Sequence, residues 1–105
     1  MSKNIYHIRL VHLKSFERGN RTWTHDRIIS SFEDIDKAVD YFMKVIKQKD
    51  PTLNKAEENE ILEGIYDDPE SLLCYPFNFW LREFRDYETY YVGPGGYVIE
   101  AAVLQ

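Results

Sequence analysis

The sequence predicts an α+β fold: an antiparallel sheet of about four strands, contributed by an N-terminal and a C-terminal hairpin, packed against a long helix and short helices. Three observations predict it. Alternating apolar and polar residues occupy both ends of the chain, helical spacing occupies the middle, and Gly- or Asn-containing turns separate the alternating segments. The 105 residues suit a single domain, residues 1–105, that buries an ordinary core.

The N-terminal hairpin is predicted from residues 4–14 and 21–29. The first segment alternates apolar and polar side chains, and the second is rich in β-branched and aromatic types. Between them, residues 15–20 contain the Gly19-Asn20 pair that is typical of a turn.

The long helix is predicted to follow this hairpin. Ser30 and Glu33 have the spacing of a capping box. Apolar residues then recur at intervals of three and four, which predicts an amphipathic helix that ends near Lys49, ahead of Pro51.

Two short helices are predicted next. Asn54 and Glu57 repeat the capping spacing, and Gly64 suits the left-handed position that often ends a helix. Asp68 can cap a further helix, because Pro69 then takes the first helical position.

The C-terminal third holds one ambiguous segment and the second hairpin. Residues 77–87 combine helical apolar spacing with a strand-like density of aromatic rings, and we favour the helix. Residues 89–92 and 97–104 predict two strands, with the glycines of residues 93–96 in the turn between them.

The charge is unevenly distributed along the chain. The net charge is −5, and residues 57–105 carry eleven carboxylates against Arg82 and Arg85, a local balance of −9. No charged-then-apolar leader stands at residues 1–4 and no apolar run approaches the roughly 20 residues of a membrane span, so we expect a cytoplasmic protein without a membrane partner. Cys74 is the only cysteine, which excludes an internal disulfide.

The densest acidic segment, residues 57–70, holds seven carboxylates and no basic residue. Four of them stand at predicted helix starts, where the macrodipole favours negative charge by about 0.3–1 kcal/mol each. These four are Glu57, Glu58, Asp68 and Glu70. The other three, Glu60, Glu63 and Asp67, place like charges on one helical stripe, which serves either as a solvated surface or as a binding surface.

Tyrosines interleaved with the acidic residues favour the binding interpretation. Tyr offers a large contact area at a low entropy cost and a hydroxyl that tolerates water. Acidic residues beside exposed Tyr suit a basic protein surface, and the commonest basic surfaces in a cell are those that bind nucleic acid. The predicted partner-binding residues are Glu60, Glu63, Tyr66, Asp67, Asp86, Glu88 and Tyr90.

Residue types that support catalysis or metal binding show no recognised spacing. His7 and His25 are predicted to lie across the first hairpin from one another, near Asp26, but no metal-ligand motif occurs. His12 shares the parity of core residues, and Cys74 lies among apolar neighbours that disfavour a thiolate. We therefore predict no catalytic residue, no metal and no cofactor, with a small His-dependent enzyme as an alternative.

The first hairpin is basic and carries aromatic residues, a combination that can bind nucleic acid directly. These residues are Lys14, Phe16, Arg18, Arg21, Trp23 and Arg27. The −9 of residues 57–105 would repel phosphate, so we predict no direct nucleic-acid binding. The hairpin can instead pair with the acidic helices of the same molecule, or with those of a second copy in a homo-oligomer.

As a small acidic chain, the sequence resembles the inhibitors that phages and mobile elements encode, including anti-CRISPR and anti-restriction proteins. It also resembles the immunity proteins that plug toxins. The resemblance is one of class and covers no motif. It implies a non-catalytic inhibitor that occupies a basic, nucleic-acid-binding surface of another protein, with a toxin-immunity protein and a homo-oligomeric structural domain as alternatives.

Overall fold

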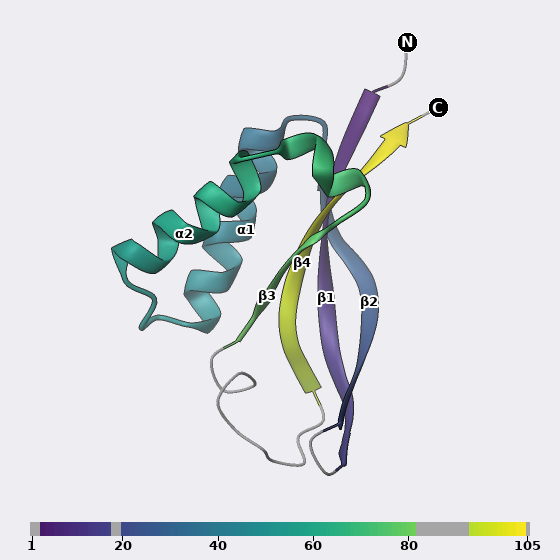
Figure 1. Cartoon of the computed structure of the whole chain (residues 1–105), viewed down its shortest axis with the longest axis vertical. Helices are drawn as coiled ribbons and strands as arrows, with labels where there is room; N and C mark the ends of the chain where they lie inside the picture. The colour runs from purple at the N-terminus through teal and green to yellow at the C-terminus, as the bar shows by residue number, and fades with distance from the viewer. Residues whose placement is uncertain (1–2, 18–19, 82–92, 105) are drawn as a thin grey trace.

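A computed structural model describes residues 3–17, 20–81 and 93–104, with side chains for residues 3–12, 27–81 and 95–104 (Figure 1). It shows a four-stranded antiparallel sheet and two α-helices among these residues, which confirms the predicted α+β class. The elements in chain order are β1 (Lys3–Glu17), β2 (Asn20–Phe32), α1 (Ile35–Lys49), α2 (Lys55–Tyr66), the 3₁₀-helix η1 (Pro69–Leu73), β3 (Phe77–Trp80) and β4 (Gly93–Leu104).

The strands lie in the order β2-β1-β4-β3, and each neighbouring pair is antiparallel. The first and last strands along the chain, β1 and β4, therefore form the centre of the sheet, and β2 and β3 form its edges (Figure 1). Ile8 in β1 lies opposite Ser30 of β2 and Ile99 of β4. Both ladders of β1 contain register shifts, which are typical of bulged strands.

The two helices lie together beside the sheet (Figure 1), and the main core forms between them and the strands. Alternate strand residues face this core, because successive side chains of a strand point to opposite faces. The buried residues from the helices are Ala38, Val39, Phe42, Ile46, Ile61 and Ile65. Those from β1, β3 and β4 are Ile8, Phe79, Tyr97, Ile99 and Ala101.

The start of α1 differs from the prediction. Ser30 belongs to β2, and the N-cap of α1 is Asp34, whose side chain accepts a hydrogen bond from the Asp36 backbone N–H at 2.8 Å. The capping spacing of Ser30 and Glu33 was therefore misleading, because pairing with β1 keeps β2 extended as far as Phe32. The helix itself runs to Lys49, where it was predicted to end.

The start of α2 is as predicted and its end is not. Asn54 and Glu57 form the capping box, with backbone-to-side-chain hydrogen bonds of 2.9 and 3.1 Å. Gly64, predicted to end the helix, lies inside it, and the helix continues to Tyr66. A Cβ at Gly64 would lie 2.7 Å from the Phe77 ring, so this glycine provides space for close packing against β3 rather than a turn.

Residues 77–80 form β3, so the predicted helix is wrong there; residues 82–87 lie outside the described residues. Apolar spacing suggested a helix, but pairing with β4 decides the conformation. Phe79 lies opposite Tyr97, and both are buried in the core. A four-residue edge strand is too short for its sequence alternation to outweigh a coincidental helical spacing.

The predicted C-terminal turn is also wrong. The glycines of residues 93–96 lie within β4, which pairs with β1 and β3, and residues 89–92 lie outside the described residues. A Cβ at Gly96 would lie 2.1 Å from the Phe79 backbone oxygen, so the glycine permits close approach of β3 and β4. The same glycines that suit a turn suit this contact.

The chain between α2 and β3 forms η1, with Pro69 at its first position as predicted. Asp68 occupies the N-cap position without a side-chain capping hydrogen bond, whereas its backbone oxygen accepts one from the Ser71 hydroxyl at 2.6 Å. Neither α-helix of the described residues has the length and hydropathy needed to cross a bilayer.

Candidate functional site

The helix α2 carries the described part of the predicted binding surface. Glu60, Glu63 and Tyr66 lie on α2, Asp67 is its C-cap, and all four are exposed. The other three predicted residues are Asp86, Glu88 and Tyr90, which lie outside the described residues.

Tyr66 joins the end of α2 to the start of α1. Its hydroxyl donates a hydrogen bond to Asp36 Oδ1 at 2.7 Å, and the side chain remains 40% exposed. The two helices are neighbours, and the N-terminal end of α1 lies beside the C-terminal end of α2 (Figure 1). The hydrogen bond therefore brings the carboxylates of α1 beside those of α2.

Burial and nearby carboxylates both act on the hydroxyl of Tyr66. Partial burial, the hydrogen bond to Asp36 and the charges of Asp36, Asp40 and Asp34 raise the pKa of Tyr66 to about 12 from its ordinary 10. Each of these effects disfavours a phenolate. Tyr66 is consequently a neutral hydrogen-bond donor, embedded among anions, throughout the physiological pH range.

We define the acidic patch as Asp34, Asp36, Asp40, Glu63, Tyr66 and Asp67. The three aspartates from α1 were missed in the sequence, where residues 32–56 balance acids against bases as a block. A partial signal was present, because the start of α1 holds three aspartates and one basic residue, Lys37, while its later turns hold Lys44, Lys47 and Lys49. Only the antiparallel arrangement of the helices shows which residues the acidic end faces.

Ion pairs among the described residues leave the acidic patch untouched. They join Lys3 to Glu33 at 3.4 Å, Lys47 to Glu58 at 2.7 Å, and Arg9 to Glu100. Lys47 lowers the pKa of Glu58, chiefly by hydrogen bonding to its carboxylate. Glu58 is thus compensated by α1, whereas the described basic residues of β1 compensate acids outside the patch.

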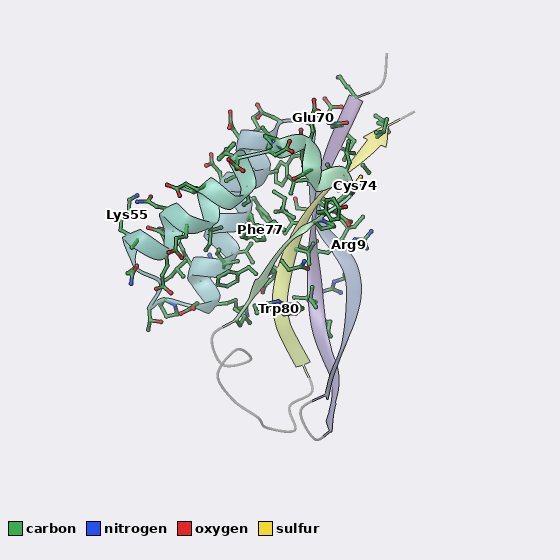
Figure 2. All side chains as sticks on the ribbon, in the orientation of Figure 1. Arg9, Lys55, Glu70, Cys74, Phe77 and Trp80 are labelled. Carbon is green, nitrogen blue, oxygen red and sulfur yellow. The ribbon has the colours of Figure 1, made fainter. Side chains whose placement is uncertain are left out.

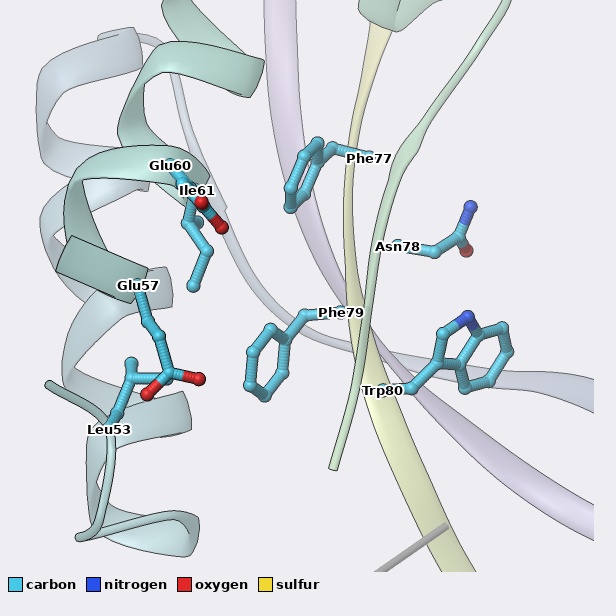
Figure 3. A pocket seen from close by; sticks show the side chains of 8 residues that line it. All are labelled: Leu53, Glu57, Glu60, Ile61, Phe77, Asn78, Phe79 and Trp80. Atoms are coloured by element: carbon cyan, nitrogen blue, oxygen red, sulfur yellow. The ribbon is translucent and has the colours of Figure 1, made fainter. Parts of the chain in front are cut away.

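A groove of about 350 Å³ lies between α2 and β3 (Figure 3). The residues that line it are Leu53, Glu57, Glu60, Ile61, Phe77, Asn78, Phe79 and Trp80. The Phe77 and Phe79 rings point towards α2, while Asn78 and Trp80 point to the other side of β3 (Figure 3). All four consecutive residues line the groove, so it follows the edge of β3 rather than one face alone.

The groove combines an apolar wall with negative charge. Phe79 and Ile61 are buried, and the Phe77 ring packs edge-on against Phe42 with centroids 6.3 Å apart. Glu57 and Glu60 supply two carboxylates, and the described lining residues include no Lys, Arg or His. Glu60 therefore belongs to the groove and not to the acidic patch.

His7 is the histidine of β1 whose side-chain contact is defined by the structure. His7 Nδ1 lies 2.7 Å from the Ser31 hydroxyl, and Glu100 is opposite His7 in β4 but forms its ion pair with Arg9. None of the described residues that line the groove is a histidine.

The predicted pairing of His7 with His25 is wrong, because His7 lies opposite Ser31 and His25 lies opposite Val11. The register of β1 and β2 separates the two histidines along the hairpin. Among the described residues, no group of three or more His, Cys, Asp or Glu side chains could hold a metal ion. Cys74 is exposed, contrary to the apolar setting its sequence neighbours suggested (Figure 2).

Comparisons with known proteins assign the chain to no family. No protein-family model matches the chain, and neither a curated protein nor a solved structure matches it.

Proposed function

We propose that this protein is a non-catalytic inhibitor that binds another protein, using the acidic patch to occupy a basic surface that otherwise binds nucleic acid. The observation that supports it is the hydrogen bond from Tyr66 to Asp36, which gathers carboxylates from two helices around one exposed aromatic ring. Asp86, Glu88 and Tyr90 are part of the proposed surface. The proposal places the protein in the cytoplasm, in the class of phage and mobile-element inhibitors.

The chemistry of the patch suits such a partner. Clustered carboxylates present negative charge where a nucleic-acid-binding surface otherwise contacts phosphates. Complementary charge accelerates association and disfavours acidic partners. Tyr66 adds apolar contact area together with a hydroxyl already oriented by Asp36. A tyrosine held in one geometry loses little conformational freedom on binding.

The charge of the patch is available for a partner. Exposed charges that are already paired contribute roughly 0–1 kcal/mol to stability and offer little to a second molecule. Glu63 and Asp67 form no ion pair with a described residue, and both are exposed. Their charges therefore serve solubility alone or a binding partner, and the proposal is that they serve a partner.

A capture experiment with a charge-matched control tests the proposal. The tagged protein is incubated with lysate of its native host at low ionic strength, and captured proteins are eluted with salt or with duplex DNA. The variant Glu63→Gln/Asp67→Asn removes two negative charges from the patch. The control Gln48→Lys/Ala56→Lys raises the net charge equally at two exposed positions towards the opposite end of the helical layer.

We expect one DNA-binding protein that DNA and salt both displace, with affinity at least about tenfold lower for the patch variant, or about 1.4 kcal/mol. The control is expected to lose less than about threefold. Equal losses in both variants would show a non-specific charge effect. Undiminished capture by the patch variant, or a captured protein that DNA does not displace, would reject the proposed function.

A further inference from the structure

We draw no further inference here: the strongest candidate, the surface patch of exposed apolar side chains at the ends of η1 and β4 (Leu73, Tyr75, Val103 and Leu104), carries none because nothing in the described residues shows what covers it.

Discussion

Tyr66 joins two segments that lie 30 residues apart in the chain. From the sequence it was an exposed aromatic among acids on one helix. In the structure its hydroxyl donates a hydrogen bond to Asp36 of another helix, and burial together with the carboxylates at the start of that helix raises its pKa. Its chemistry therefore depends on a neighbour that the local sequence does not contain.

The first prediction concerns the titration of Tyr66. Its pKa of about 12 in the folded protein exceeds the ordinary 10, so the fold favours the neutral phenol. This contribution to the free energy of unfolding is complete below pH 10 and is lost as the pH rises through 12. Asp36→Asn is expected to lower the pKa towards 10 without reaching it, because burial is the largest cause of the shift.

Tyrosine-selective ¹³C NMR across alkaline pH measures this pKa. Glu33→Gln is the control, because Glu33 lies close in sequence but is paired with Lys3 and does not contribute to the shift. A Tyr66 pKa that is the same in the Asp36→Asn variant and the parent protein would contradict the arrangement of the acidic patch.

At the scale of elements, local residue spacing predicted the helices whose tertiary contacts favour the same conformation. The amphipathic spacing of α1 and the capping pair of α2 are strong local signals, and the structure contains both. Residues 77–80 and 93–96 have weaker local preferences, and their conformation comes from pairing between β3 and β4. Glycine illustrates the difficulty, because a sequence does not distinguish a turn glycine from one that permits close backbone approach.

The second prediction follows from this contact. Gly96→Ala would place a methyl group 2.1 Å from the Phe79 backbone oxygen, so β3 must move away from β4. We expect the free energy of unfolding to fall by about 3 kcal/mol, at the upper end of overpacking costs. Urea denaturation followed by circular dichroism measures the change.

Gly64→Ala is the comparison variant. Its methyl group would meet the edge of the Phe77 ring, which can rotate away, and alanine favours a helix by about 1 kcal/mol over glycine. We therefore expect a smaller loss than for Gly96→Ala. A fully stable Gly96→Ala variant would show that β3 and β4 do not pair at this distance.

At the scale of the whole molecule, one core joins both helices to the sheet. Phe42 of α1 is fully buried and packs against Phe77, the first of the groove-lining residues of β3. The acidic patch and the groove therefore both depend on this core, because α1 and α2 supply residues of the patch and α2 and β3 supply residues of the groove.

The third prediction tests how much this core contributes to stability. Phe42→Ala is expected to lower the free energy of unfolding by about 4 kcal/mol, because the cavity left behind cannot collapse fully. Tyr75→Ala, at a side chain that is 78% exposed, is the matched aromatic truncation and should change it by less than about 0.5 kcal/mol. Thermal unfolding of both variants provides the measurement; comparable losses would contradict the placement of α1 on the sheet.

The sequence alone determined the α+β class, the capping box of α2 and the presence of excess carboxylates on that helix, because each depends on residues within a few positions of one another. The tertiary structure decided which acids of α1 join them, where β3 lies, and that Glu60 faces a groove. These features depend on contacts between distant segments, and a local pattern contains no information about its partner across the fold.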